Sequence, residues 1–150
     1  MTEPLTVLAP VDGTVVALAD VPDPVFAGQI VGSGVAIDPD RTPATVVAPV
    51  SGRLLKLHPH AFVLLTAGGT GLLVHLGIDT VQLDGEGFEL LATEGDEVAA
   101  GAPIVHWDPA AVEEGGRSPI VPIVVMDSAP DSVHGAVTGA VRVGQEIFTV

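Results

Sequence analysis

The chain has no cysteine among its 150 residues. It can therefore form neither a disulfide framework nor a thiolate nucleophile. A metal site in this chain would have to use histidine and carboxylate ligands. The missing cysteine says little about the compartment, because a cysteine-free protein tolerates either redox state.

Positive charge is also scarce. Five Lys and Arg residues stand against nineteen Asp and Glu residues, which gives a formal net charge of −14. A nucleic-acid partner is not expected, because binding a phosphate backbone requires Lys and Arg. The acidity suits a basic protein partner met by electrostatic steering, and colloidal solubility is the alternative explanation.

No apolar run approaches the ~20 residues that a membrane-spanning helix needs. The chain does not open with a basic stretch followed by an apolar one, as a signal peptide would. We therefore expect a cytoplasmic protein without stable membrane insertion. With 47% apolar residues, residues 1–150 are expected to form one domain around a single core.

The sequence is rich in turn formers, with eighteen Gly and thirteen Pro between short runs of Val, Leu and Ile. This pattern predicts an all-β fold of short strands. Residues 9–13 (Ala-Pro-Val-Asp-Gly) recur at 48–52 (Ala-Pro-Val-Ser-Gly), and a Val-x-x-Gly-x-x-Val/Ile pattern begins at Val25, Val98 and Val141. Each copy of the second pattern predicts a glycine turn entering a strand. Such repeats predict a pseudo-symmetric β-sandwich or barrel.

The sequence predicts one short helix near 108–114, with Asp108 as N-cap, Pro109 at the first position and Gly115 past the end. Residues 119–126 are expected to form an edge strand, because Pro122 cannot donate a ladder hydrogen bond. Residues 129–150 are expected to close the sheet with a final hairpin.

His75 is the main candidate for chemistry. It interrupts the apolar run 72–78, and strand alternation places Leu73, His75 and Gly77 on one face, with residues 72, 74, 76 and 78 on the other. The imidazole would then stand beside a residue without a side chain, which leaves room for a reactant. A structural histidine bonded on a sheet face is the alternative.

His60 is the expected partner of His75. On the preceding strand His58, His60, Phe62 and Leu64 would share a face, and the glycine-rich turn 66–71 would fold that strand back beside His75. Two facing imidazoles disfavour double protonation, so at least one should be neutral at pH 7 and nucleophilic.

Asp79 is a candidate supporting residue. Exposed carboxylates more than about 8 Å away are screened at physiological salt. Asp79 would lie about 13 Å from His75 along an ideal strand. It therefore reaches the site only if the strand ends at Gly77 and the chain turns, and the alternative is a turn cap.

A second chemistry uses the same side chains. His58, His60, His75 and Asp79 could hold a tetrahedral zinc with an open position, as in a zinc-dependent hydrolase or peptidase. The pair of motifs His-x-His and His-x-Gly-x-Asp resembles the metal site of lysostaphin-type zinc endopeptidases, with their order along the chain reversed.

Along nearly its whole length the sequence resembles the glucose-family enzyme IIA components of the bacterial phosphoenolpyruvate-dependent sugar phosphotransferase system. The matching stretches are 9–13, 21–27, 31–37, 48–52, 60–62, 74–81 and 85–88. The resemblance implies a Greek-key β-sandwich with a duplicated hybrid motif, and a phosphotransferase component that works without a cofactor.

The resemblance also implies roles for individual residues. Nε2 of His75 would accept a phosphoryl group from the histidine phosphocarrier protein HPr and pass it to a cysteine of the enzyme IIB domain of a glucose or N-acetylglucosamine-type permease. His60 would stabilise the transferring group without being modified. Many relatives carry a threonine at the position of His58, where it orients the first histidine, so incidental zinc binding by His58, His60 and His75 is a further expectation. An apolar rim for docking is expected from Val25, Phe26, Phe62, Ile78 and Val81.

Overall fold

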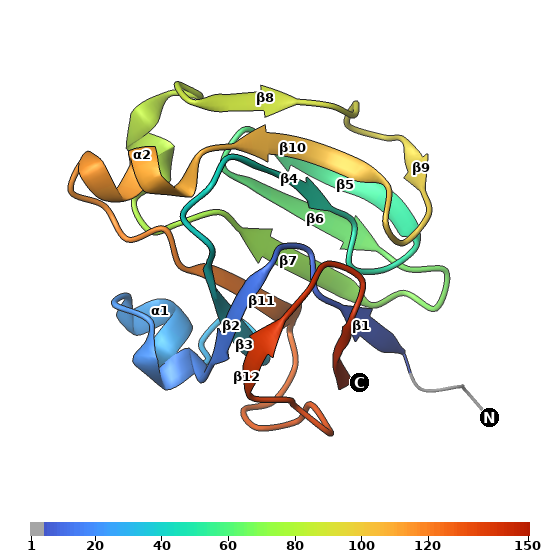
Figure 1. Cartoon of the computed structure of the whole chain (residues 1–150). Coiled ribbons are helices and arrows are strands. Elements are labelled where there is room, and N and C mark those ends of the chain that lie inside the picture. Colours follow the sequence, from blue (N-terminus) through green and yellow to red (C-terminus); the bar gives the residue numbers. More distant parts are fainter. Residues whose placement is uncertain (1–4) are drawn as a thin grey trace.

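The computed structural model describes residues 5–150, and its regular structure is mostly antiparallel β-strand with a few short helical segments (Figure 1). The largest sheet has eight strands in the order β12-β2-β3-β11-β7-β6-β5-β9. In that order the strands are Gly139–Val141, Gly13–Val16, Gly32–Pro39, Val121–Met126, Gly71–His75, Ala61–Leu65, Gly52–His58 and Glu97–Val98.

Two smaller sheets complete the all-β fold. A three-stranded sheet has the order β4-β10-β8 and a two-stranded sheet pairs β1 with β13. The strands are β4 (Ala44–Val47), β10 (Pro103–Trp107), β8 (Phe88–Leu90), β1 (Thr6–Leu8) and β13 (Glu146–Thr149). The helical segments are η1 (Leu18–Asp20), α1 (Pro24–Ala27), η2 (Thr80–Leu83) and α2 (Pro109–Glu114). The expected sandwich of short antiparallel strands is confirmed.

The sequence repeats make equivalent contacts. The amide of Leu8 bonds the carbonyl of Pro49, and the amide of Val47 bonds the carbonyl of Pro10, both at 3.0 Å. Gly101 donates to Ala48 and Gly144 donates to Ala9, so each repeat receives one glycine turn. Both turn glycines have positive φ, as predicted.

The copy of the glycine pattern that begins at Val25 was predicted wrongly. Gly28 has φ −83°, because it is the C-cap of α1 and does not form a positive-φ turn like Gly101 and Gly144. Positive φ falls instead on the following residue, Gln29.

The helix near 108–114 is confirmed with its Asp108 cap, but α1 was missed. The signal for α1 is Asp23 followed by Pro24, the same Asp-Pro start as in α2, but α1 is a shorter helix.

Two further strand predictions were wrong. β11 lies between β3 and β7 in the large sheet instead of at an edge. Pro122 is tolerated there because pairing with β7 begins only at Ile123, so the proline stands at the end of the strand with β3 alone beside it. The last two strands do not form a hairpin with each other, since β12 pairs with β2 and β13 pairs with β1.

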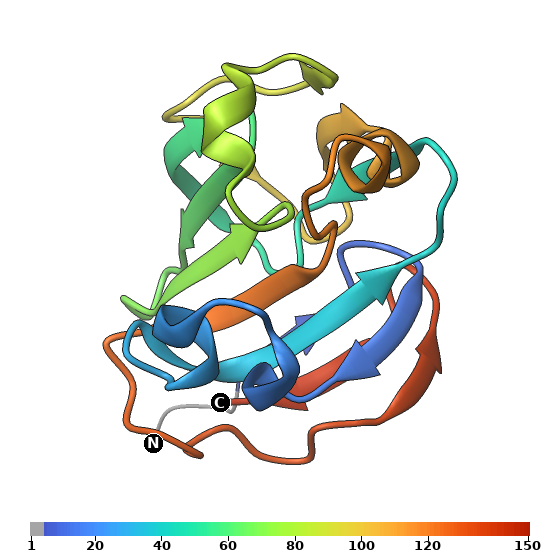
Figure 2. The ribbon, with the colours of Figure 1, turned by 90° about the vertical axis from the view of Figure 1, so that its left-hand side faces the viewer.

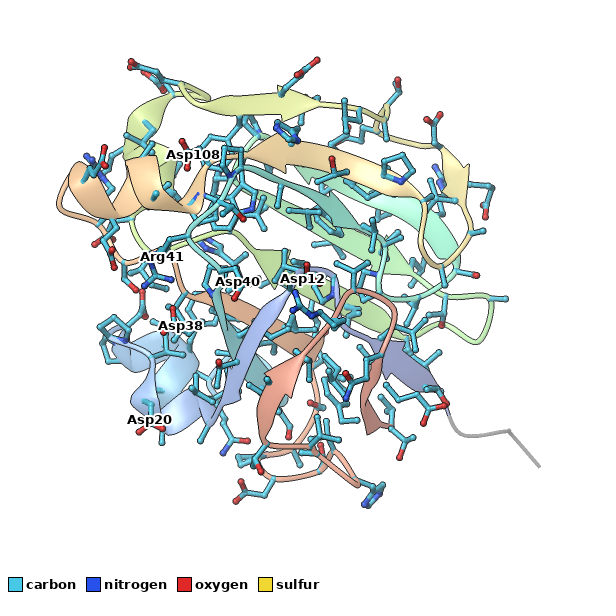
Figure 3. The ribbon with its side chains drawn as sticks, viewed as in Figure 1. Asp12, Asp20, Asp38, Asp40, Arg41 and Asp108 are labelled. Carbon is cyan, nitrogen blue, oxygen red and sulfur yellow. The ribbon has the colours of Figure 1, made fainter. Side chains whose placement is uncertain are left out.

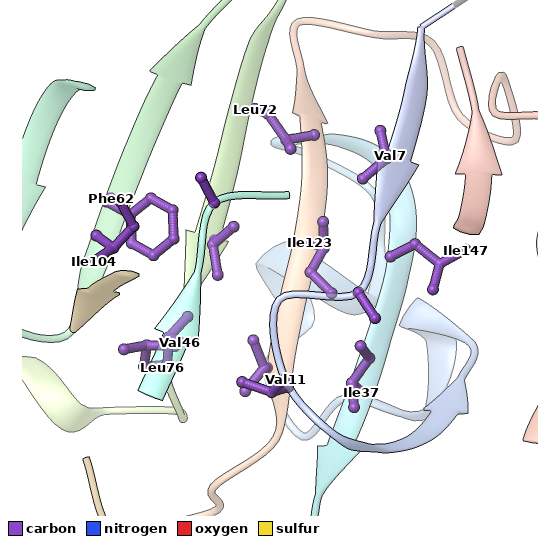
Figure 4. Close-up of a cluster of buried hydrophobic side chains, with 14 of the residues drawn as sticks. Val7, Val11, Ile37, Val46, Phe62, Leu72, Leu76, Ile104, Ile123 and Ile147 are labelled. Atoms are coloured by element: carbon purple, nitrogen blue, oxygen red, sulfur yellow. The ribbon is translucent and has the colours of Figure 1, made fainter. Parts of the chain in front are cut away.

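One apolar core lies between the sheets, and Figure 4 shows part of it. Phe62 of β6 and Ile104 of β10 are both 0% exposed and lie side by side there. A smaller cluster lies where α1 covers β3 and β11 (Figure 2), and it contains Phe26, Ala36, Val124 and Ile78. Burial of this second cluster fixes α1 against the sheet.

Two ion pairs of Arg41 connect the large sheet to the helix that follows β10. Arg41 contacts Asp38 of β3 at 2.7 Å and Glu113 of α2 at 2.8 Å. Figure 3 shows Arg41 beside Asp38, between the sheet and α2. All three side chains are about a third exposed or more, so each pair contributes at most ~1 kcal/mol.

Candidate functional site

Two antiparallel hairpins bring His60 and His75 together. The turn at residues 66–70 folds β7 back on β6, and Ala61 pairs with His75. His75 is the last residue of β7, and His60 immediately precedes β6. The amide of Leu76 donates to the carbonyl of His60 at 2.7 Å, which ties the two segments together. The predicted pairing of these strands is confirmed.

The expected position of His60 on a strand was wrong. Pro59 and His60 form the turn between His58 and Ala61, the last pair of the β5–β6 ladder. Phe62 and Leu64 point into the core, both 0% exposed, whereas His60 is half-buried at the surface. Because His60 lies in this turn, the direction of its side chain is not set by the alternation of side chains along β6.

Four rings follow one another at this site. The centroids of His60 and His75 lie 5.3 Å apart with the planes at 72°. Phe26 of α1 lies 5.3 Å from His75 at 57°. On the other side, His58 stacks on His60 at 5.8 Å and 24°. The two candidate imidazoles thus face each other, and both are half-buried rather than sealed from solvent.

The tautomer of His75 follows from one short hydrogen bond. Its Nδ1 lies 2.6 Å from the carbonyl oxygen of Gly77. A carbonyl oxygen can only accept, so Nδ1 carries the proton when the ring is neutral. The lone pair of the neutral ring is therefore on Nε2, which is the nitrogen left free for a nucleophilic role.

Gly77 serves the site through its backbone, not by leaving room beside the ring as the sequence suggested. Its φ is +80°, and an added Cβ would lie 2.6 Å from Cγ2 of Thr80 and 2.9 Å from the carbonyl of Ser118. Its amide donates to Ile120, and the amide of the next residue donates to Ser118. The carbonyl that holds His75 therefore belongs to a fixed peptide.

The positive φ at Gly77 also changes the predicted faces of this segment. Leu72, Val74 and Leu76 lie in the main core as expected. Ile78 was expected beside them, yet it packs in the second cluster with Phe26. The strand ends at His75, so the strict alternation does not continue to residue 78.

Burial makes both histidines weaker bases. The pKa of His60 is lowered from 6.5 by burial, and further by the nearby His75 and His58. Burial also lowers the pKa of His75, outweighing the Gly77 carbonyl, Asp23 and Asp79, which each favour the protonated ring. Both rings therefore stay neutral at pH 7.

Two carboxylates are close enough to act on His75. Because the strand ends early and Asp79 itself has φ +60°, the chain turns and Asp79 contributes to the electrostatics of the ring. Asp23 acts more strongly, and sequence reasoning missed it. Asp23 caps α1 by accepting from the amide of Val25 at 2.8 Å, and the Asp-Pro signal of that cap could have identified it.

The expected apolar rim divides into exposed and buried residues. Val25 is 43% exposed and Val81 is 58% exposed, so both can meet a partner. Phe26 and Ile78 are 7% and 5% exposed and lie beneath that surface. Phe62 was predicted wrongly, because it points into the main core and is 0% exposed. Ile30, after α1, is 74% exposed and was missed.

The zinc alternative is not supported. Within residues 5–150, no group of three or more His, Cys, Asp or Glu side chains is arranged to hold a metal ion. His58 stacks on the face of His60, and Nδ1 of His75 is already engaged by Gly77. The four residues named for a zinc site thus do not converge.

Within residues 5–150, no helix is both long and apolar enough to span a membrane.

Comparison with known proteins identifies the family. The sequence model of the family described as "phosphoenolpyruvate-dependent sugar phosphotransferase system, EIIA 1" matches residues 5–130. A glucose-specific EIIA component from Bacillus cereus is 41% identical over 142 residues, covering 93% of this chain and 85% of the relative. One from Staphylococcus aureus is 43% identical over 126 residues, covering 83% and 75%.

A solved structure agrees with these sequence matches. The glucose permease IIA from Mycoplasma capricolum superposes with a TM-score of 0.91 at 37% identity, covering 99% of this chain and 96% of the other. The fold, the family match and the relatives point to one conclusion. This chain belongs to the EIIA 1 family of the phosphoenolpyruvate-dependent sugar phosphotransferase system.

Proposed function

We propose that the chain is a cytoplasmic phosphoryl carrier in which His75 takes the phosphoryl group on Nε2. The donor is the phosphohistidine of HPr, and the acceptor is the cysteine of an enzyme IIB domain in a glucose or N-acetylglucosamine-type permease. The observation that carries the proposal is the hydrogen bond from Nδ1 of His75 to the Gly77 carbonyl. It leaves the Nε2 lone pair free to attack phosphorus.

Each transfer exchanges one phosphorus bond for another. In the first, the Nε2–P bond forms as the N–P bond of the donor phosphohistidine breaks, and the donor imidazole keeps the electron pair. In the second, a thiolate of the acceptor forms an S–P bond as the Nε2–P bond breaks. His75 returns to the neutral ring with its proton on Nδ1, so no net proton is gained or lost at this residue.

His60 is proposed to stabilise the transferring group. Its ring lies edge-on to His75, with centroids 5.3 Å apart. The lowered pKa of His60 keeps it neutral at pH 7, and a neutral imidazole has one N–H to donate. A donor placed beforehand beside developing charge is the main source of catalysis in phosphoryl transfer.

The surface around His75 suits docking of a protein rather than enclosure of a metabolite. Val25, Ile30 and Val81 are exposed on or next to α1 and η2. Asp23 and Asp79 add negative charge close to His75. An apolar patch with acidic residues beside it favours a partner with matching apolar residues and basic side chains. The sugar would then be selected by the membrane component.

The proposal is tested by incubation with labelled phosphoenolpyruvate, enzyme I and HPr. The chain should gain label that is lost in acid and kept in base, and His75→Ala should gain none. His60→Ala should alter the transfer rate to the IIB domain without moving the label to another residue. His134→Ala, an exposed histidine outside the site, is the matched control. Label that persists in His75→Ala contradicts the proposal.

A further inference from the structure

The Gly77 carbonyl that holds His75 belongs to a short turn between β7 and η2. The strand ends at His75, and positive φ falls on Gly77 at +80° and on Asp79 at +60°. Backbone of this kind persists only where the surrounding structure determines it. The position of the carbonyl therefore depends on what fixes the two peptides on either side of the Gly77 α-carbon.

The peptide that follows Gly77 is bonded at both ends. Its carbonyl accepts the Nδ1 proton of His75 at 2.6 Å. Its N–H belongs to Ile78 and donates to the carbonyl of Ser118 at 2.9 Å. The bond from Ile78 leaves this peptide free to tilt about the line of that bond, so the orientation of the Gly77 carbonyl also depends on the peptide before it.

The peptide before Gly77 is held by one backbone bond and one side-chain bond. The Gly77 amide donates to the carbonyl of Ile120 at 3.0 Å. The carbonyl of Leu76 accepts from the Thr80 hydroxyl at 2.7 Å, and within residues 5–150 no other hydrogen bond to this carbonyl is found. The amide of Leu76 in turn donates to His60. Leu76 thus links Thr80 to the segments of both histidines.

The Thr80 side chain is fixed in the direction that this bond needs. Thr80 is the first residue of η2 and is 1% exposed. Its methyl group lies against Gly77, where an added Cβ would be 2.6 Å from Cγ2, and a β-branched side chain is stiff at χ1. In the described part of the chain, Asp79 makes no capping bond with its side chain. The Thr80 hydroxyl instead ties the start of η2 back to the end of β7.

We propose that Thr80 is a positioning residue for phosphoryl transfer, because its hydroxyl holds the Gly77 turn in the form that keeps the Nδ1 proton on His75 and leaves Nε2 as the nucleophile. This inference rests on the proposed phosphoryl transfer through His75. Thr80 acts through Gly77, since it is buried and its hydroxyl is bonded to the backbone. Without the hydroxyl, the buried Leu76 carbonyl loses its partner and the turn must shift to recover one.

Two substitutions separate the hydroxyl of Thr80 from its methyl group. Thr80→Val keeps the shape of the side chain but removes the hydroxyl, and Thr80→Ser keeps the hydroxyl but removes the methyl. Thr66→Val is the matched control. The Thr66 hydroxyl also bonds the backbone, at the amide of Thr70 at 3.1 Å, in the turn at the opposite end of β7 from His75. Two-dimensional NMR checks that each protein is folded.

The first readout needs no phosphoryl transfer. Nitrogen-15 NMR shows which nitrogen of the neutral His75 ring carries the proton. In the unaltered chain, Thr66→Val and Thr80→Ser, the proton should be on Nδ1. In Thr80→Val a measurable fraction should move to Nε2. The pKa of His75 should also fall further in Thr80→Val, because the bond to the Gly77 carbonyl raises that pKa.

The second readout is single-turnover phosphoryl transfer from HPr to His75. Thr80→Val should be about twofold to tenfold slower, which is the factor that one ordinary hydrogen bond contributes. Thr80→Ser should recover most of the rate, and Thr66→Val should match the unaltered chain. The HPr concentration at half-maximal rate should stay within about twofold in Thr80→Val, because the hydroxyl acts on the His75 ring and not on docking.

A His75 proton that stays wholly on Nδ1 in folded Thr80→Val overturns the inference, and so does an equal change of tautomer in Thr80→Ser. If Thr80→Val does not fold, the unaltered chain decides. Its Thr80 hydroxyl proton should be visible by NMR and protected from exchange, and rapid exchange with water overturns the inference. If His75→Ala still accepts label, the phosphoryl-carrier proposal fails, while the tautomer still decides whether Thr80 orients His75.

Discussion

The carbonyl oxygen of Gly77 accepts the Nδ1 proton of His75 at 2.6 Å, from a position two residues further along the same chain. The ring is thereby oriented by the backbone that follows its own strand. Because the acceptor is a backbone carbonyl, no substitution at position 77 removes the acceptor atom itself. The bond depends on the positive φ of Gly77 and on the peptides that hold that turn.

The first prediction concerns Gly77→Ala. The matched control is Gly87→Ala, since Gly87 has φ +87° but an added Cβ would meet nothing within 4 Å. The stability of Gly87→Ala should fall by only about 1–2 kcal/mol, which is the cost of left-handed backbone for a residue with a Cβ. Gly77→Ala should lose about 1–3 kcal/mol more, because its Cβ overlaps Thr80 and Ser118.

Denaturant unfolding measures both stabilities, and the phosphorylation rate is measured on the folded protein. Gly77→Ala should accept label more slowly, since any shift of the turn moves the carbonyl that orients His75. Gly87→Ala should accept it at the rate of the unaltered chain. Equal losses of stability in the two variants would show that the space around Gly77 is not crowded.

The second prediction concerns pH. Burial lowers the pKa of both His60 and His75 below the ordinary value of 6.5. As the pH falls below 6.5, the unfolded chain binds protons at these positions and the folded chain does not. The free energy of unfolding should therefore decrease from about pH 6.5 downward until the folded rings titrate, and should be unaffected by these groups above it.

The direct measurement is an NMR titration of the imidazole signals. The midpoints of His60 and His75 should both lie below 6.5. In His75→Ala the pKa of His60 should move back toward 6.5, because the charge of His75 is one cause of its lowering. A His75 midpoint above 6.5 would mean that the Gly77 carbonyl and the carboxylates outweigh burial.

The third prediction separates two roles of Asp23. Its carboxylate raises the pKa of His75 and caps α1 through the amide of Val25. Asp23→Asn removes the charge but keeps a good N-cap, so the pKa of His75 should fall further with little loss of stability. Asp23→Ala should cost about 1 kcal/mol as well. NMR titration and thermal unfolding distinguish the two effects, and a His75 pKa that rises in Asp23→Asn is the contrary result.

The fourth prediction separates the docking surface from the core. Val81 is exposed and Phe62 is fully buried. Val81→Ser should weaken HPr binding, measured by calorimetry, while the unfolding midpoint stays nearly unchanged. Phe62→Ala should cost about 3–5 kcal/mol of stability. Any loss of HPr binding in Phe62→Ala should scale with the fraction of protein unfolded. Weaker binding by a fully folded Phe62→Ala would place that residue in the interface.

The sequence was sufficient to predict the class of fold and the paired histidines. The repeats at 9–13 and 48–52 and the turn at 66–71 are local signals, and the turn is enough to predict that β6 pairs with β7. Repulsion between two facing imidazoles led to the prediction that at least one ring is neutral. Burial is the first cause of the lowered pKa of both rings, and repulsion by His75 adds to it at His60.

Features that depend on the whole fold could not be predicted from local patterns. Phe62 is apolar and lies two residues from His60, and this local pattern suits either a surface or a core position. In the fold Phe62 lies beside Ile104 of β10, in the main core. Likewise, the role of Gly77 is set by Thr80 and by Ser118, which lies far along the chain. Asp23 reaches His75 only because the second apolar cluster seats α1 against the sheet.

The site of phosphorus attachment within the His75 ring is the most direct test of this account. Nitrogen-15 and phosphorus-31 NMR of the phosphorylated chain, kept at alkaline pH, identifies which ring nitrogen bears the group. With Nδ1 bonded to Gly77, the phosphoryl group should be on Nε2, and the Nδ1 proton should remain hydrogen bonded. Phosphorus on Nδ1 of His75, or on His60, would contradict it.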